Sequence, residues 1–147
     1  MNPTALKFGY PQTLVAENAH WLLLLRPRQV TLGSLVLVCK EPVQAFGEVS
    51  AAAFGSLQTM IAGTESLLKD FVGYQRINHL MLMMVDPDVH FHVIPRYPGS
   101  KHHAGLEFVD AGWPNPPVLA SGIELDPALR GELAAELAAR WPQANCG

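Results

Sequence analysis

The chain has 147 residues, of which 49% are apolar and 16% are charged, and its formal net charge is −3 at pH 7. This length supports one domain with a hydrophobic core, and we expect a single domain over residues 1–147. The negative net charge and the absence of a basic run argue against electrostatic binding along a nucleic-acid backbone. It does not exclude binding of a single nucleotide.

Compartment is indicated by what the chain lacks. Residues 1–13 contain no continuous apolar stretch of the kind that signal peptides carry, and no apolar run is long enough to span a bilayer. Only Cys39 and Cys146 are present, which is not a disulfide framework. We therefore expect a cytoplasmic protein without membrane contact.

The N-terminal part of the chain predicts two buried strands. Residues 1–12 include prolines and a glycine and are expected to be irregular, whereas 13–18 predict a short helical turn. The continuous apolar runs 20–25 and 34–39 are typical of strands that are buried on both faces. The loop between them contains Arg-Pro-Arg, so we expect an antiparallel pair.

The clearest helix covers residues 50–72. Its apolar side chains, from Phe54 to Phe71, recur every three or four residues, which is the spacing of one helix face. Ser50 can cap the N-terminus, and Gly73 stands where a helix end favours a left-handed residue. We assign this apolar face, including Phe54, to the core.

The remaining elements follow the helix. Residues 74–85 predict a strand whose methionines (Met81, Met83 and Met84) fill the core, and Asp86-Pro87-Asp88 predicts the turn of a hairpin. Residues 98–125 are expected to be loop-rich, with a short strand at 106–109. Asp126 and Pro127 begin a C-terminal helix. The class is α+β, with an antiparallel sheet, one long central helix and a C-terminal helix.

One strand has an unusual chemical pattern. Asp88, His90 and His92 alternate with apolar residues, so a strand places these three side chains on one face. Burying three ionisable groups without partners costs several kcal/mol each, and the row therefore favours a site open to solvent or ligand. Incidental histidines on a solvated strand are the alternative.

This strand resembles the signature of the histidine triad (HIT) family of nucleotide hydrolases and transferases, which is His-φ-His-φ-His-φ-φ with φ apolar. His90 and His92 match the second and third histidines, and Pro95-Arg96 matches a common ending. Asp88 stands at the first histidine. Met83-Met84-Val85 replaces a Gly-Gln-Ser/Thr segment that in many HIT proteins binds phosphate or protonates the leaving group. The resemblance covers about half of the chain, over residues 20–97.

The resemblance implies a role for each residue. His90 matches the nucleophile that attacks an α-phosphate, and His92 can donate to that phosphate. Such a nucleophile needs a hydrogen-bond acceptor on its far nitrogen to fix the tautomer. Asp88 can replace the first histidine by accepting from an imidazole, or its charge can repel phosphate. Asn78 and Arg26 match substrate contacts; alternatively they are a strand amide and a solvated loop cation.

The sequence thus predicts a nucleotide phosphohydrolase or nucleotidyl transferase. Its substrate would be a dinucleoside polyphosphate, such as diadenosine tetraphosphate, or a nucleoside phosphoramidate. The resemblance further implies a homodimer that needs no cofactor, although Mg²⁺ can accompany a polyphosphate.

Three alternatives remain open. The first is a nucleotide-binding protein that has lost catalysis. The second is a zinc enzyme using His90 and His92, with Asp88 or His102 as third ligand. The third is an interaction protein with incidental histidines. His102 and His103 are expected to be exposed, or to reach over the site and hold phosphate.

Overall fold

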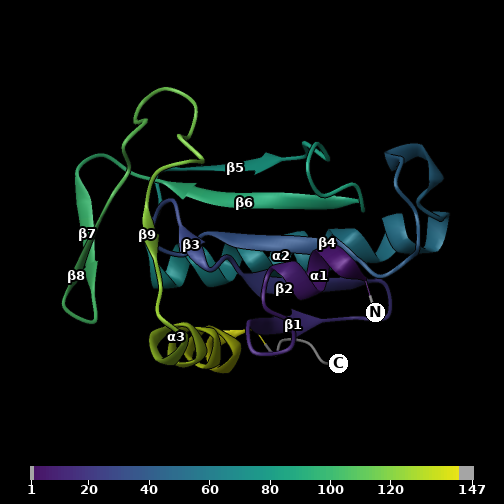
Figure 1. The fold of residues 1–147 in the computed structure, drawn as a ribbon, viewed down its shortest axis with the longest axis horizontal. Coiled ribbons are helices and arrows are strands. Elements are labelled where there is room, and N and C mark those ends of the chain that lie inside the picture. Colours follow the sequence, from purple (N-terminus) through teal and green to yellow (C-terminus); the bar gives the residue numbers. More distant parts are fainter. Residues whose placement is uncertain (1, 143–147) are drawn as a thin grey trace.

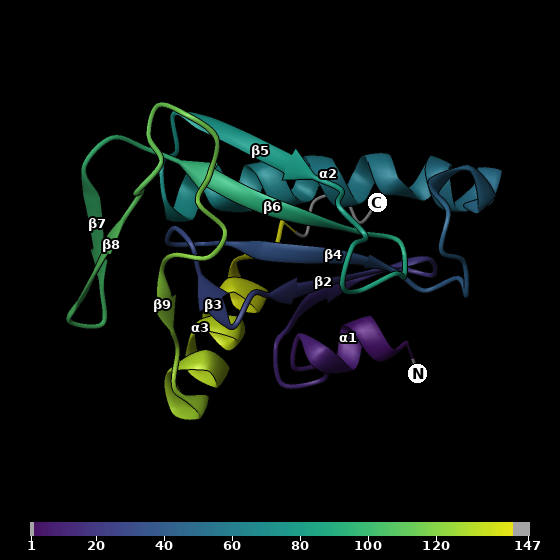
Figure 2. The ribbon, with the colours of Figure 1, turned by 45° about the horizontal axis from the view of Figure 1, so that its top comes forward.

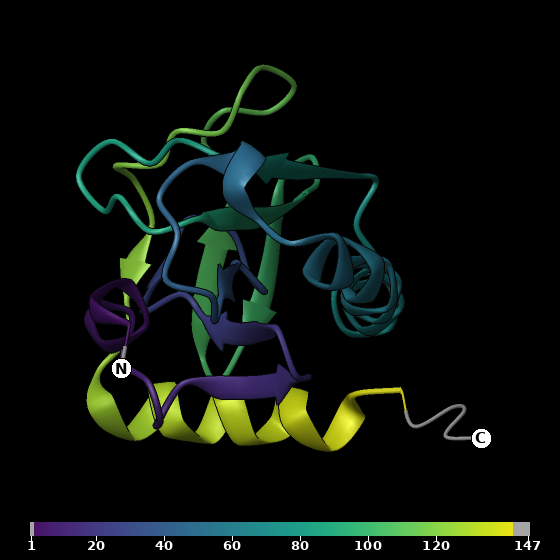
Figure 3. The same ribbon diagram turned by 90° about the vertical axis from the view of Figure 1, so that its right-hand side faces the viewer.

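The computed structural model describes residues 2–142 and contains a five-stranded antiparallel sheet with helices on both faces (Figure 1). The strand order is β1 (Leu14–Glu17), β2 (Trp21–Leu25), β4 (Leu35–Cys39), β6 (His90–Arg96) and β5 (Arg76–Leu80). Seen along the sheet, helix α2 (Ala51–Phe71) covers one face, α1 (Pro3–Lys7) lies on the other, and α3 (Pro127–Arg140) runs under the β1 edge (Figure 3). The α+β class with an antiparallel sheet is confirmed.

Smaller elements surround this sheet. Strand β3 (Arg28–Gln29) pairs with β9 (Ile123–Glu124), β7 (Ser100–His103) pairs with β8 (Leu106–Val109), and a short 3-10 helix covers Phe46–Glu48. The β7–β8 hairpin extends from the end of the sheet away from α1 (Figure 2). The expected strand at 106–109 is confirmed, whereas the rest of 98–125 contains more regular structure than its loop-like sequence indicates.

The two sheet faces bury two separate apolar clusters. The larger one joins the α2 face to helices α2 and α3. The smaller one packs Leu22, Leu24, Val36 and Val38 against Phe8 next to α1. All residues of β2 and β4 are buried, which confirms that these runs are covered on both faces.

The predicted helix boundaries hold. Ser50 Oγ accepts from Ala53 N at 3.1 Å, Gly73 has a φ of +67°, and Asp126 Oδ1 accepts from Leu129 N at 2.9 Å. Phe54 is a correction, because it is 40% exposed and packs on Phe46 with ring centroids 5.3 Å apart. It lies one position beyond Ala53, which is the residue that faces the sheet.

The predictions for residues 3–7 and 13–18 were wrong. Residues 3–7 form a helix because Asn2 Oδ1 accepts from Thr4 N at 2.8 Å and from Ala5 N at 3.1 Å, and a proline is favoured in the first turn. The expected helical turn at 13–18 is instead β1, which pairs with β2. Backbone pairing with a neighbouring strand outweighs a weak local preference there.

The strand predicted over 74–85 ends at Leu80. Leu80 pairs with His92, and β6 begins at His90, so little partner strand remains beyond this pair. Residues 81–88 therefore form a loop, in which Met84 is 83% exposed and Met83 has a φ of +45°. The core role predicted for the methionines was wrong for Met84, whereas Met81 does pack against the core.

Two compartment-related features can be located. Cys39 is a free, buried thiol in β4, and Cys146 lies outside the described residues. Within residues 2–142, no helix combines the length and hydropathy needed to cross a membrane.

Candidate active site

The histidine rings lie on the α1 face of the sheet. His90 pairs with Val38 and His92 with Val36, and their ring centroids are 5.1 Å apart. The Phe8 ring lies 6.1 Å from His90 and 5.9 Å from His92. The predicted alternation holds for His90 and His92, since Phe91 and Val93 pack into the cluster on the α2 face, whereas Asp88 lies in the loop before this strand. Both rings are largely buried, with His90 2% and His92 7% exposed.

The two histidines form part of the wall of a cavity of about 280 Å³. Its lining comes from α1 and the residue after it, the loop after β2, the loop between β5 and β6, the histidine strand, and the loop between β8 and β9: Lys7, Phe8, Arg26, Leu82, Met83, Met84, Val85, Asp86, His90, His92 and Leu119. The segment that differs from the HIT pattern, Met83 to Val85, is therefore at the cavity. It brings apolar side chains where the resemblance leads one to expect a hydroxyl and an amide.

The tautomer of His90 is fixed by the backbone. His90 Nδ1 lies 2.6 Å from the main-chain oxygen of Asp88. A carbonyl oxygen can only accept, so Nδ1 carries the proton and the neutral ring keeps its lone pair on Nε2. Because His90 lines the cavity, this lone pair is the one available to a ligand there.

The Asp88 carboxylate does not meet an imidazole. Its Oδ2 accepts from Thr4 Oγ1 at 2.8 Å, and the nearby Lys7 Nζ lies 2.9 Å from Asp86 Oδ1. Both contacts connect α1 to the loop before β6. The residue at the first triad position therefore supports His90 through its main chain, and its side chain holds the helix that covers the rings.

His92 is in a different electrostatic environment. Burial, followed by the charges of Arg26 and His90, lowers its pKa to about 4. His92 is therefore neutral near pH 7, and its Nδ1 is buried without a hydrogen-bond partner among the described residues. A neutral imidazole can still donate one hydrogen bond to a bound phosphate.

Arg26 is the charged residue that contributes most to lowering the pKa of His92. Its Nη1 donates to Arg28 O at 2.9 Å, while its Nε is buried and has no hydrogen-bond partner within residues 2–142. Burial and the charge of Arg28 lower the pKa of Arg26, but a guanidinium remains charged near neutral pH. The structure thus brings Arg26, His90 and His92 to one cavity.

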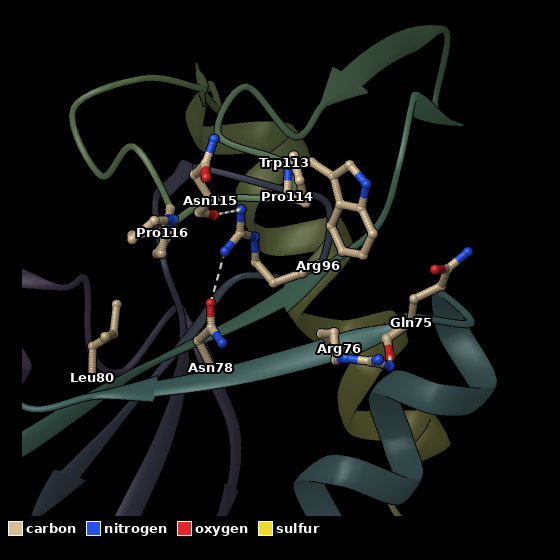
Figure 4. A pocket seen from close by; sticks show the side chains of 10 residues that line it. Gln75, Arg76, Asn78, Leu80, Arg96, Trp113, Pro114, Asn115 and Pro116 are labelled. Atoms are coloured by element: carbon tan, nitrogen blue, oxygen red, sulfur yellow. Dashed lines mark hydrogen bonds between the residues drawn. The ribbon is translucent and has the colours of Figure 1, made fainter.

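Asn78 lies outside this cavity. Its Oδ1 accepts from Arg96 Nη1 at 2.8 Å, and both residues line a second cavity of about 590 Å³ (Figure 4). Arg96 is also paired with Asp110, at 2.7 Å from Nε to Oδ2. Sequence reasoning missed this ion pair, because only the Pro-Arg ending of the motif drew attention to Arg96 and nothing local connects it with Asp110.

The other histidines are located elsewhere. His102 Nε2 is 3.8 Å from Glu107, and His103 packs on Phe71 and lies 3.6 Å from Glu136. Neither lines the His90 cavity. Within residues 2–142, no three His, Cys, Asp or Glu side chains are grouped to hold a metal ion, so the third ligand of the zinc alternative is not found there.

Similarity to known proteins comes from structure. No protein-family model and no curated protein matches the chain. A histidine triad protein from Sinorhizobium meliloti superposes with a TM-score of 0.73 at 18% identity, covering 95% of each chain. One from Bradyrhizobium japonicum gives 0.68 at 18% identity, covering 87% of this chain and 89% of its own.

A third similar structure is that of a hydrolase. The diadenosine triphosphate hydrolase of Plasmodium falciparum, solved with cyclomarin A, superposes with a TM-score of 0.66 at 7% identity. That superposition covers 88% of this chain and 76% of the hydrolase. At these identities the likeness concerns the fold, and the chain therefore has the fold of the histidine triad proteins.

Proposed function

We propose that this protein is a histidine triad enzyme that cleaves a nucleotide substrate through a nucleotidyl–His90 intermediate. The observation that carries the proposal is the 2.6 Å contact between His90 Nδ1 and the main-chain oxygen of Asp88. It leaves Nε2 as a nucleophilic lone pair on the wall of a cavity that also contains Arg26.

The reaction follows from these groups. Nε2 of His90 attacks the α-phosphorus, the bond to the bridging oxygen breaks, and its electron pair leaves with the distal part of the substrate. The Asp88 carbonyl stabilises the positive charge that develops on the ring. Arg26, and a donor hydrogen of His92, stabilise the phosphoryl oxygens. Water then cleaves the phosphorus–nitrogen bond and releases a nucleoside monophosphate.

The loop between β5 and β6 favours one substrate class. Met83, Met84 and Val85 have no proton to give to a leaving group. A phosphate leaves as a stable anion, whereas an amine needs a proton from a general acid. The site therefore suits a dinucleoside polyphosphate better than a nucleoside phosphoramidate. We propose that no cofactor is required and that Mg²⁺ can accompany the polyphosphate; activity with and without added Mg²⁺ tests this.

The intermediate can be trapped. We expect that wild-type protein mixed briefly with diadenosine tetraphosphate gains the mass of a nucleotidyl group and releases product, and that His90→Ala does neither. His79→Ala is the matched control, because His79 faces α2 and contacts Glu65 at 3.2 Å. Equal turnover by wild type and His90→Ala would overturn the proposal.

The second candidate is a nucleotide-binding protein without turnover. It is favoured by Asp88 at the first triad position and by the apolar segment at the cavity. In that case AMP would raise the Tm of the wild-type protein, and no product would form from any substrate.

The homodimer implied by the resemblance is also a proposal, which sedimentation equilibrium tests directly.

A further inference from the structure

The second cavity, of about 590 Å³, has no part in the chemistry at His90. Strand β5 forms one side of it with Arg76, Asn78 and Leu80, and the loop after β8 forms the other with Trp113 and Asn115. Arg96 lies between them (Figure 4). The lining thus combines an aromatic ring, amides and cations.

Arg96 gives this cavity a fixed base. It is 4% exposed, and its guanidinium donates to both Asp110 oxygens at 2.7 and 3.0 Å, to Asn115 O at 2.7 Å and to Asn78 Oδ1 at 2.8 Å. Four of its five N–H groups are therefore used, and Asp110 offsets its charge. Because Asn78 accepts through Oδ1, its amide orientation is set and its NH₂ group is left to donate to a ligand.

The cavity also has a free cation and a stacking surface. Arg76 is exposed, and its guanidinium forms no ion pair with any residue in the range 2–142. Trp113 is half-buried at the cavity wall. Aromatic rings stack on nucleobases of any sequence, amides hydrogen-bond to base edges, and arginines bind phosphate. This combination fits a nucleoside that carries phosphate.

The two cavities adjoin on one sheet face. Leu80 lines the second cavity and pairs with His92, which lines the first. Asn78 is two residues further along β5, a step of roughly 7 Å at the usual rise per strand residue. An extended ligand with a phosphate at the histidines can therefore continue past Leu80 into the second cavity.

We propose that the second cavity binds the distal nucleoside of a dinucleoside polyphosphate whose α-phosphate lies at His90. The base stacks on Trp113 and hydrogen-bonds to the Asn78 amide, and Arg76 contacts the phosphate chain. This inference rests on the proposed function, which supplies the dinucleoside polyphosphate that would occupy both cavities. The second cavity as a nucleoside site can be tested independently of turnover.

The test measures binding by calorimetry in a His90→Ala background, where substrate is not consumed. The probes are diadenosine tetraphosphate and AMP, and the quantity compared is the ratio of their Kd values. We expect Trp113→Ala to reduce the preference for diadenosine tetraphosphate about tenfold, as the loss of one stacked base does. Trp113→Phe should keep most of that preference. Arg76→Ala should also reduce it, whereas Arg140→Ala, which removes a cation on α3, should not.

Each outcome bears on the proposal. An unchanged ratio in both Trp113→Ala and Arg76→Ala overturns it. The proposal is also overturned if these substitutions change the oligomeric state and leave the ratio of Kd values unchanged. The lining of the second cavity would then be a contact between copies of the chain. If the wild-type protein turns over no nucleotide but the ratio still depends on Trp113, the nucleoside site stands and the proposed catalytic function fails. If neither probe binds, both fail.

Discussion

The buried ion pair between Arg96 and Asp110 leads to a quantitative prediction. Asp110 is 6% and Arg96 4% exposed. The carboxylate accepts two bonds from the guanidinium, one from Tyr97 N at 3.2 Å and one from Gly112 N at 3.3 Å. The substitution Asp110→Asn keeps the shape of the side chain but removes its charge. It leaves the Arg96 guanidinium buried without a counter-charge.

The magnitude follows from this burial. Breaking a buried pair by removing one partner costs about 3–5 kcal/mol, because the remaining charge stays desolvated. Asparagine still offers one acceptor oxygen, so we expect the lower end, about 3 kcal/mol. This is a large part of the roughly 5–15 kcal/mol by which most proteins are stable. For a domain of this size it corresponds to a fall in Tm of about 6–12 °C.

Urea titration at pH 7 of wild type and Asp110→Asn measures the loss. The matched control is Arg140→Ala, which breaks exposed contacts at 3.2 Å to Asp70 and 3.1 Å to Glu136. Exposed pairs contribute about 0–1 kcal/mol, so the control should change little. A loss below about 1 kcal/mol in Asp110→Asn, or equal losses in the two variants, would refute the argument that burial makes this pair important.

Three further predictions concern the histidine cavity. The pKa of His92 is about 4 in the folded protein and about 6.5 in its usual state, so the unfolded chain binds this proton more readily. Acidification from pH 7 to pH 4 should therefore lower the free energy of unfolding by at most about 3 kcal/mol. Urea titrations across this range should show a shallower pH dependence in His92→Asn, and identical slopes would contradict the assignment. Arg26→Ala should weaken AMP binding about tenfold or more, measured by calorimetry, because it removes a guanidinium that has no carboxylate partner within residues 2–142. Arg28→Ala, which removes a cation paired with Glu124 at 3.6 Å, serves as the control. Asp88→Ala should lower kcat far less than His90→Ala does, since the acceptor for His90 is a main-chain oxygen; equal losses in steady-state assays would show that the carboxylate itself takes part.

Elements with strong local signals were predictable from the sequence. Strands β2 and β4 consist of continuous apolar runs, and α2 combines one apolar face with a serine cap and a C-terminal glycine. Helix α1 has only five residues, and β7 is the polar segment Ser-Lys-His-His. Such segments are ordered by partners that lie far away in the chain, which a local pattern does not reveal.

The same limit applies to the site. The shared face of His90 and His92 follows from the two-residue period of a strand, and the structure shows it. The position of Asn78 depends on the register between β5 and β6. Leu80 pairs with His92, whereas Asn78 pairs with Ile94 and is therefore two residues further from the histidines. Asn78 has the sequence separation from Asp88 that the resemblance requires, but it does not line the histidine cavity. From Leu80 toward Arg76, β5 runs away from that cavity.

The role of the main chain at Asp88 bears on how the first triad position can vary. A side chain is needed there only if it supplies the hydrogen bond that orients the nucleophile. In this protein the Asp88 carbonyl accepts such a bond at 2.6 Å from His90, the proposed nucleophile, and any residue has a carbonyl at this place. The side chain is then available for another contact, and here it accepts from Thr4 to hold α1 beside the rings. An aspartate at this position is therefore compatible with a correctly oriented nucleophile, and its negative charge is directed to a hydroxyl and not to the face of the histidines.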